Sequence, residues 1–324
     1  MGSSPPVLRV ALLTTAFPRW PNDGRAPWIL HTARALRDQG AQVRVITVHG
    51  PDTHPFELVD GIPVHRVRYL WPDDLERLQD VGGGLPLAWR SGWLYRLGFG
   101  PLFLALLWAA IRHGRDVDVI HAHWTLAGFA AWLARSFTKT PFVLTVHGSD
   151  IYVAPKVAGV AALTSFMLRD AGHVLAASSD MAQTTSRLGL STGRVEVLPY
   201  GVELDRFHMG STRREQVVLF VGSLICRKGV QHLLAAMPGV LERCPRARLV
   251  IVGEGTERQA LETQAHALGL DSRIQFTGQQ TRDEIAAWMR VARVFVLPSL
   301  EEAFGVVLLE ALASGTPCVA SRIG

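Results

Sequence analysis

The sequence predicts an α/β protein built from two doubly wound, Rossmann-like parallel sheets. Short apolar segments rich in β-branched residues alternate with helical patterns along the 324 residues. Near-continuous apolar strands are typical of a parallel sheet covered by helices on both faces. The alternation pauses in a polar, poorly periodic segment at 200–216 and then restarts, which predicts two successive units. The length agrees, because a domain has roughly 100–200 residues.

The first unit is expected to contain strands separated by helices, the first of which ends at Gly40. The predicted strands cover 7–14, 42–48, 116–124, 141–148, 171–179 and 194–201, and the predicted helices include 26–40 and 126–137. In the second unit the predicted strands cover 216–223, 248–255, 273–278, 293–299 and 316–321, with helices at 228–244, 257–270 and 306–315. We place the domain boundary between residues 205 and 206, giving an N-terminal domain at 1–205 and a C-terminal domain at 206–324.

Composition limits the function classes. The formal net charge of +5 comes from both halves, and no dense Lys/Arg tract occurs, so nucleic-acid binding is not expected. The surplus suits an anionic ligand or a membrane surface, although basic charge also simply aids solubility. Three cysteines, Cys226, Cys244 and Cys318, are far apart in sequence and indicate a reducing, cytoplasmic compartment.

The most apolar segment is Leu97–Ile111, which contains Gly98, Gly100 and Pro101. A membrane-spanning helix needs about 20 residues, so this segment is read as too short. It is expected to form a buried helix, with peripheral contact with the inner face of a membrane as the alternative.

Ligands bind open parallel sheets at the carboxyl ends of the strands. After the first strand of the second half come Arg227, Lys228 and Gly229, where a helix begins. The free N–H groups of a helix start, with two cations, make a phosphate site. Only three lysines occur beside thirty arginines, which favours a specific role for Lys228. The alternative is a solvated cation.

Residues 298–315 contain a predicted apolar helix with one carboxylate before it and another inside it. Glu302 precedes the helix and Glu310 lies inside it. A carboxylate can accept two hydrogen bonds from vicinal hydroxyls, as in ribose and sugars, and the amides of 304–307 offer a second anion site. The alternative is that Glu310 reaches solvent or pairs with an arginine.

Other patterns are weaker. Gly253 and Gly255 mark a tight turn, and no G-x-G-x-x-G follows the first strand of either half, which argues against a dinucleotide-binding dehydrogenase. His121 and His123 share one face of a strand and either line the acceptor side or pack in the core. Asp116 and Asp118 spell D-x-D but precede a strand, at the wrong end for a cleft. No metal site is predicted.

The segment Glu302–Glu310, with seven residues between the glutamates, resembles the signature of the family-four retaining glycosyltransferases of GT-B fold. The segments 220–237, 248–255, 273–279 and 198–207 are similar to the phosphate loop, the next two strands and the interdomain segment of this family. The segments 17–36, 121–124 and 145–150 resemble the acceptor half of bacterial members that build polysaccharides. The resemblance covers nearly the whole chain.

The resemblance implies two domains facing a cleft, a UDP- or GDP-sugar donor and no metal or other cofactor. Its implied catalytic residues are His147, facing the transferred sugar, Glu302, holding hydroxyls of that sugar, and Asp150, on the acceptor side. Its implied donor-binding residues are Gly24, Arg227, Lys228, Phe304, Gly305, Val306, Val307 and Glu310.

The implied reaction moves a sugar to a glycan or lipid-linked acceptor with retention of configuration. Two departures from the pattern are noted: Ser223 stands where many members have an arginine, and the chain ends at Gly324 where members continue. The second domain is therefore expected to be incomplete. A non-catalytic nucleotide-sugar-binding subunit or inactive fragment, and a GT-B-like sugar-phosphate epimerase, are the alternatives.

Overall fold

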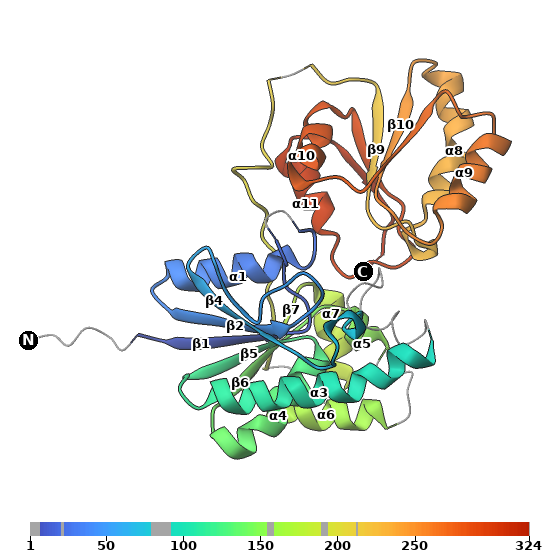
Figure 1. The fold of residues 1–324 in the computed structure, drawn as a ribbon. Coiled ribbons are helices and arrows are strands. Elements are labelled where there is room, and N and C mark those ends of the chain that lie inside the picture. The colour runs from blue at the N-terminus through green and yellow to red at the C-terminus, as the bar shows by residue number, and fades with distance from the viewer. Residues whose placement is uncertain are drawn as a thin grey trace, which may run out of the picture. The chain divides into compact units, whose positions relative to one another are not determined.

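The computed structural model describes residues 7–20, 23–78, 92–153, 159–188, 194–211 and 213–323. The chain divides into two compact units, Met1–Pro199 and Tyr200–Gly324. In Figure 1 the first unit runs from blue to yellow-green and the second from yellow to red. Each unit is an open α/β sheet with its own core, as the alternation of strands and helices predicts.

In the described residues the first unit forms an eight-stranded sheet of order β3-β4-β2-β1-β5-β6-β7-β8. The strands are β1 (Arg9–Thr14), β2 (Gln42–Val48), β3 (Phe56–Val59), β4 (Ile62–Val67), β5 (Val119–His123), β6 (Phe142–Val146), β7 (His173–Ala176) and β8 (Val195–Val197). All pair in parallel except β3 with β4. The sequence reading missed this edge hairpin, because β3 alternates between exposed and partly buried residues and lacks the continuous apolar character of the central strands.

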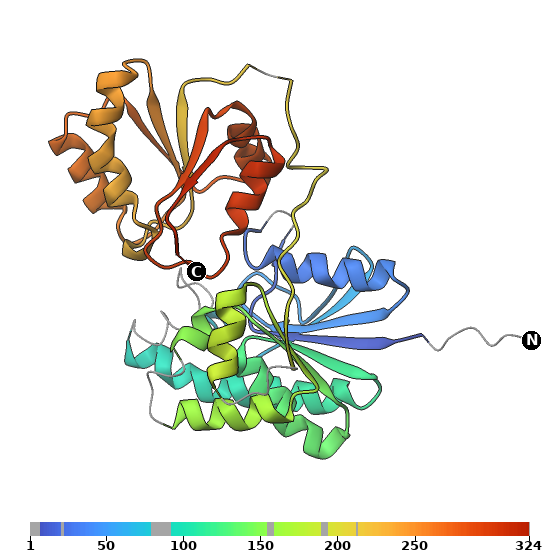
Figure 2. The same ribbon diagram turned by 180° about the vertical axis from the view of Figure 1, so that it is seen from behind.

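Helices cover both faces of the first sheet. They are α1 (Pro27–Asp38), α3 (Trp93–Gly114), α4 (Thr125–Thr138), α5 (Ser149–Val153), α6 (Val160–Asp170) and α7 (Ser179–Arg187), with a 3-10 turn η1 at Asp73–Leu75. Figures 1 and 2 show α1 on one face and α3, α4 and α6 together on the other. The sheet is therefore doubly wound.

Helix α3 is longer than the apolar segment suggests. It runs 22 residues, and its part Arg96–Gly114 is long and apolar enough to cross a membrane by length and composition. The length argument from the sequence was therefore wrong, because the helix extends beyond the apolar stretch at both ends. Leu102 and Leu106 are fully buried, and α3 packs against α4 and the sheet. This packing makes α3 a core helix of the first unit.

In the described residues the second unit forms a five-stranded parallel sheet of order β11-β10-β9-β12-β13. The strands are β9 (Val217–Val221), β10 (Arg248–Val252), β11 (Ile274–Gly278), β12 (Val294–Leu297) and β13 (Cys318–Ala320). The helices are α8 (Val230–Arg243), α9 (Arg258–Ala267), α10 (Arg282–Val291) and α11 (Val306–Ala313), and the 3-10 turn η4 (Cys226–Lys228) precedes α8. All five strand predictions in this half match a strand to within a few residues.

The boundary lies earlier than the sequence placed it. Residues 200–205, assigned to the first domain from the sequence, belong to the second unit. Phe207 is fully buried in the second core, and Val202 packs against that core. Arg214 donates hydrogen bonds to the carbonyls of Ala292 (2.7 Å) and Ser314 (3.0 Å). Much of the polar segment is thus bound to the second unit, because its few apolar residues find partners that sequence periodicity does not reveal.

Candidate functional site

Both sheets have a topological switch point, where the strand order reverses. In the second unit it lies between β9 and β12, since β10 and β11 extend one way from β9 while β12 and β13 extend the other. In the first unit it lies between β1 and β5. Open α/β sheets bind ligands in the crevice at the carboxyl ends of such strands. Most of the residues predicted from the sequence follow these strands or their neighbours, so each unit is described in turn.

In the second unit the loops after β9 and β12 are joined backbone to backbone. The carbonyl of Arg227 accepts from the amides of Leu300 (2.7 Å) and Glu301 (3.4 Å). Gly229 has a φ of 71°, and a Cβ there would lie 1.9 Å from the carbonyl oxygen of Pro298. Only glycine allows the two loops to approach this closely. The turn η4 and residues 298–305 therefore lie side by side at the carboxyl ends of β9 and β12.

Lys228 and Glu302 form an ion pair between these two loops. The Lys228 Nζ lies 2.6 Å from the Glu302 Oε2, and Ser299 Oγ donates to the same oxygen at 3.0 Å. Both side chains are mostly buried, with 18% and 17% exposed. The predicted phosphate lysine is thus an ion-pair partner of the predicted sugar carboxylate rather than a solvated cation. Arg227 beside them is exposed.

Glu310 is buried in α11, with 3% of the residue exposed. Its Oε1 accepts from the Arg282 Nη2 at 2.8 Å. Burial raises the pKa of Glu310, and the Arg282 guanidinium partly offsets this effect. The pairing with an arginine that the sequence left open therefore occurs. It uses one carboxylate oxygen, and a role for Glu310 toward ribose hydroxyls stays a prediction.

Arg282 also joins Glu310 to the segment that enters the second unit. Its Nε lies 3.2 Å from the Glu203 Oε2, and its guanidinium lies 5.0 Å from the centre of the Phe207 ring. Arg206 donates to Glu203 and, at 2.8 Å, to Asp283. Sequence reasoning missed Arg282 and Glu203. Motif spacing could not find them, because they lie 28 and 107 residues before Glu310 in the sequence (310−282 and 310−203).

The amides of 304–307 lie where α11 begins. Val306 is the first helical residue, and Gly305 before it has a φ of 74°, a left-handed conformation that favours glycine. The ring of Tyr200 meets that of Phe304 edge-on at 5.3 Å. The N-terminal end of α11 and the Lys228–Glu302 pair therefore belong to the same loop region. This is the arrangement that the predicted anion site requires.

In the first unit a column of histidines lies in β5 and directly after β6. The rings of His121 and His123 stack at 4.3 Å, and His123 Nδ1 lies 3.1 Å from His147 Nε2. Trp124 lies against His147, with ring centres 4.2 Å apart. Burial lowers the pKa of His147 to about 3 and that of His121 to about 4, so both rings are neutral at pH 7. His147 can therefore act as a neutral hydrogen-bonding group.

Asp150 is partly buried near the start of α5 and hydrogen-bonded to the backbone. Its oxygens accept from the amides of His147 (3.2 Å), Ile151 (3.1 Å) and Thr125 (3.0 Å). Burial raises the pKa of Asp150, and these N–H groups oppose the shift. Through these contacts Asp150 holds the loop that carries His147 against the first turn of α4. Contact with an acceptor stays a prediction.

The remaining predicted residues are placed as follows. Gly24 lies exposed in the loop after β1, next to Asp23, whose carboxylate accepts from the amides of Arg19 (3.0 Å) and Arg25 (3.2 Å). Asp118 and Asp116 pair with Arg9 (2.7 Å) and Arg44 (2.9 Å) near the amino ends of the strands, away from the carboxyl edge, as expected.

A group of three possible metal ligands lies elsewhere in the first unit. His49, Asp73 and Glu76 could offer ligand atoms to one ion. However, His49 is bonded to Glu76 and, at 3.0 Å, to the Thr53 carbonyl, while Glu76 also accepts from the amide of Leu70 at 3.1 Å. These bonds account for His49 and Glu76 as a tie between loops, and Asp73 pairs with Arg68 at 3.1 Å.

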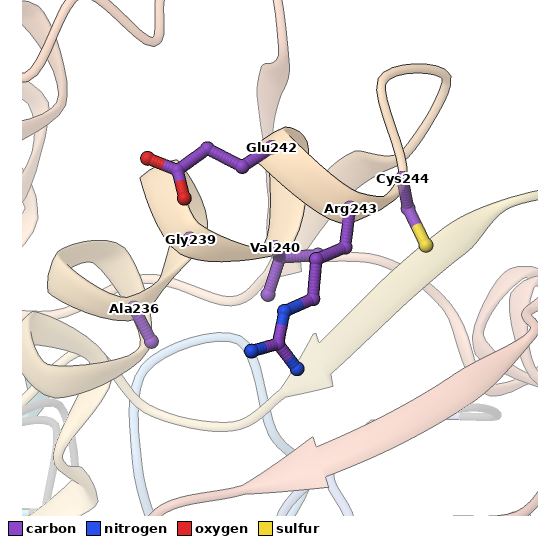
Figure 3. A pocket seen from close by; sticks show the side chains of 6 residues that line it. All are labelled: Ala236, Gly239, Val240, Glu242, Arg243 and Cys244. Atoms are coloured by element: carbon purple, nitrogen blue, oxygen red, sulfur yellow. The ribbon is translucent and has the colours of Figure 1, made fainter.

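A hollow of about 510 Å³ lies on α8 and is lined by Ala236, Gly239, Val240, Glu242, Arg243 and Cys244 (Figure 3). Helix α8 starts at the carboxyl end of β9 and runs back toward the amino end of β10, so Cys244 is at the opposite edge of the sheet from Lys228. The hollow therefore does not belong to the site.

The two successive Rossmann-like units, each an open and mostly parallel sheet covered by helices, have the architecture of glycosyltransferases of GT-B fold. Residues 202–324 match the family model of group 1 glycosyl transferases, and residues 23–201 match that of the glycosyl transferase 4-like domain. The chain belongs to the family-four glycosyltransferases.

Relatives and solved structures agree with this assignment. A phosphatidyl-myo-inositol mannosyltransferase of Mycobacterium leprae is 33% identical over 302 residues, which cover 91% of this chain and 74% of the relative. The structure of sucrose-phosphate synthase from Thermosynechococcus elongatus has a TM-score of 0.75 at 22% identity, covering 98% and 82% of the two chains. That of Anabaena HepE in complex with UDP-glucose has a TM-score of 0.69 at 19% identity, covering 98% and 80%. Both structures share the fold.

Proposed function

We propose that this protein transfers a sugar from a nucleotide diphosphate sugar, UDP- or GDP-linked, to a glycan or lipid-linked acceptor with retention of configuration. One observation carries the proposal. The switch-point crevice of the second unit holds Lys228 within 2.6 Å of Glu302, beside the N-terminal end of α11 and the buried Glu310. A cation and helix N–H groups suit a diphosphate, and two carboxylates suit hydroxyl pairs.

Each group has a proposed role. Lys228 and Arg227 bind the diphosphate, with the amides of residues 304–307. Glu310 accepts from the ribose hydroxyls, and Glu302 accepts from hydroxyls of the transferred sugar. Because Lys228 and Glu302 are already paired, donor binding replaces a bond within the protein with bonds to the ligand. Their pairing orients both side chains before the donor binds.

The first unit contributes His147, Asp150 and Gly24 in this proposal. His147 makes a neutral hydrogen bond to the transferred sugar, because its pKa of about 3 keeps the ring uncharged. Asp150 fixes the loop that carries His147, and Gly24 leaves room for the donor phosphates in the loop after β1.

The chemistry needs no metal or other cofactor. As the bond from the anomeric carbon to the diphosphate oxygen breaks, Lys228, Arg227 and the helix N-terminus stabilise the charge that develops on the leaving group. The acceptor hydroxyl attacks from the same face, and the leaving phosphate takes its proton. We therefore expect EDTA to leave both donor binding and the transfer rate unchanged.

One relative supports the choice of acceptor class. The Mycobacterium leprae relative is a phosphatidyl-myo-inositol mannosyltransferase, which supports a lipid-linked acceptor. A glycan acceptor is the second candidate. We infer a cytoplasmic location from the three free cysteines, which are all unpaired.

Donor binding is tested by thermal unfolding with UDP, GDP and ADP. We expect one of them to raise the melting temperature of the wild type, since a ligand at 100 times its Kd adds about 2.7 kcal/mol of stability. Glu310→Ala should abolish the shift. Glu301→Ala is the matched control, because Glu301 is an exposed loop residue that bonds through its amide. If no nucleotide diphosphate stabilises the protein, the donor site is refuted.

Transfer is tested with a panel of radiolabelled nucleotide sugars and membrane or glycan acceptors. The anomeric configuration of the product is measured by NMR. A configuration equal to that of the donor supports retention. Binding without transfer or donor hydrolysis would instead favour a non-catalytic nucleotide-sugar-binding subunit. Conversion of the sugar itself without an acceptor would favour an epimerase.

A further inference from the structure

The first unit exposes an unusual number of large apolar side chains on three helices. Each is between 37% and 65% exposed, and their positions alternate with buried residues on the same helices. They are Leu97, Leu104 and Trp108 on α3, Leu133 and Phe137 on α4, and Val160, Leu163 and Phe166 on α6. Scattered exposed apolar residues are normal, but a contiguous group on one face marks an interaction surface.

The three helices form one layer. Helix α3 packs along α4, and α4 packs along α6, on the face of the sheet opposite α1 (Figures 1 and 2). On α3 the residues Leu102 and Leu106 face inward and are fully buried, whereas Leu104 and Trp108, two positions on, are exposed. The layer therefore has an inner apolar face that covers the sheet and an outer one. We call the outer one the α3–α4–α6 face.

The charge on these helices is predominantly positive. Between residues 93 and 115, and between 125 and 139, there is no aspartate or glutamate, while Arg96, Arg112, Arg115, Arg135 and Lys139 are present. Helix α6 adds Arg169 and Asp170. Six cations and one acid thus equal the net charge of +5 of the whole chain. Residues 1–205 as a whole carry only +2, so the positive charge of the first unit is concentrated on the layer that carries the exposed apolar residues.

Cations also lie directly against the exposed rings. The Arg112 guanidinium lies 5.3 Å from the centre of the Trp108 ring, and that of Arg169 lies 5.9 Å from Phe166. Near one end of the layer, Arg135, Arg169 and Arg194 line a hollow of about 350 Å³ together with Asp170, Ala171 and Gly172. Apolar rings with long basic side chains among them suit the boundary between lipid headgroups and acyl chains.

We propose that the α3–α4–α6 face docks on an anionic bilayer. The exposed leucines and aromatic rings enter the headgroup region, and the arginines bind lipid phosphates, including one in the hollow between Arg135, Arg169 and Arg194. Charge complementarity decides the occupant: a second copy of this face would bring like charges together. The proposal bears on the lipid-linked acceptor but does not depend on sugar transfer.

The inner packing makes the contact peripheral. If α3 crossed the bilayer, Leu102, Leu106 and their partners on the sheet would have to separate, and the core of the first unit would be lost. Docking on the outer face leaves that core intact. It therefore uses the apolar character of α3 without unfolding the domain.

The test is co-sedimentation of the full chain with vesicles of phosphatidylcholine alone or with 30% phosphatidylglycerol, without donor or acceptor. We expect binding to the anionic vesicles that weakens with salt and is reversed by high salt or carbonate. Leu104→Ser with Phe137→Ser should lower the partition coefficient by about tenfold or more. Arg112→Gln should lower it by about fivefold on anionic vesicles only.

The control is Leu204→Ser with Leu268→Ser, which removes two exposed leucines from the second unit. It should leave vesicle binding unchanged, and circular dichroism and thermal unfolding should confirm that both double variants fold. Equal binding by wild type and the Leu104/Phe137 variant would overturn the proposal, as would absence of vesicle binding. If light scattering shows that the wild type is a dimer and the Leu104/Phe137 variant is a monomer, the face binds a second copy of the chain instead. Release by detergent only would indicate a spanning helix. None of these results affects the donor-binding test.

Discussion

Gly229→Ala tests whether the close approach of the loops after β9 and β12 shapes the candidate donor site. Gly229 lies between η4 and α8 with a φ of 71°. An added Cβ would lie 1.9 Å from the carbonyl oxygen of Pro298 and 2.9 Å from its carbonyl carbon. Both atoms belong to backbone, so no side-chain rotation relieves the clash. The loop after β12 must therefore move away from η4.

The cost has three parts. The left-handed conformation costs a residue with a Cβ about 1–2 kcal/mol. Moving the loops apart breaks the 2.7 Å bond from the Leu300 amide to the Arg227 carbonyl, worth about 1 kcal/mol. The shift of packed backbone adds about 1–3 kcal/mol. We expect the free energy of unfolding to fall by about 3–6 kcal/mol, with a large loss of affinity for the nucleotide diphosphate in any folded protein.

The matched control is Gly239→Ala in the same helix. A Cβ there meets nothing within 4 Å, and Gly239 is not among the positive-φ residues. Alanine should therefore stabilise α8 by about 0.5–1 kcal/mol. Urea unfolding of the three proteins measures both effects, and nucleotide titration measures the site. If Gly229→Ala unfolds within about 1 kcal/mol of the wild type, the loops are not held as described.

Two further predictions concern ionisable groups. Arg282→Met removes the cation beside Glu310, so the raised pKa of Glu310 should rise further. Ribose binding needs the ionised carboxylate, so nucleotide affinity should increase with pH through the pKa of Glu310. In the variant the midpoint of this increase in affinity should move to higher pH. An unchanged pH profile would contradict the role of Arg282. The pKa values of His121 and His147, about 4 and 3, lie below those of the unfolded chain. Below the unfolded value of about 6.5 the unfolded chain takes up protons and the folded chain does not, so the free energy of unfolding should fall as pH drops from 7 to 5. His121→Gln should flatten this dependence in urea unfolding, and an equally steep dependence in the variant would refute the assignment.

Much of the architecture is readable in the sequence. The strands and helices of both units follow from apolar segments and their period, because a central parallel strand must be apolar on both faces. The placement of Lys228 and Glu302 after two strands also follows, since strand ends define the ligand-binding edge. The edge hairpin β3–β4 and the true length of α3 do not follow, because their residues are only partly apolar.

The partners of the site residues required the tertiary structure. Lys228 and Glu302 are 74 residues apart, and Glu310 and Arg282 are 28 apart, so no local period relates them. Sheet topology brings these pairs together by placing β12 beside β9. The fold likewise joins the exposed residues of α3, α4 and α6 into one face. The sequence by itself determined which elements form and at which sheet edge the candidate site lies, because these depend on local apolar pattern. Which side chains meet there depends on strand order, and only the folded chain decides that.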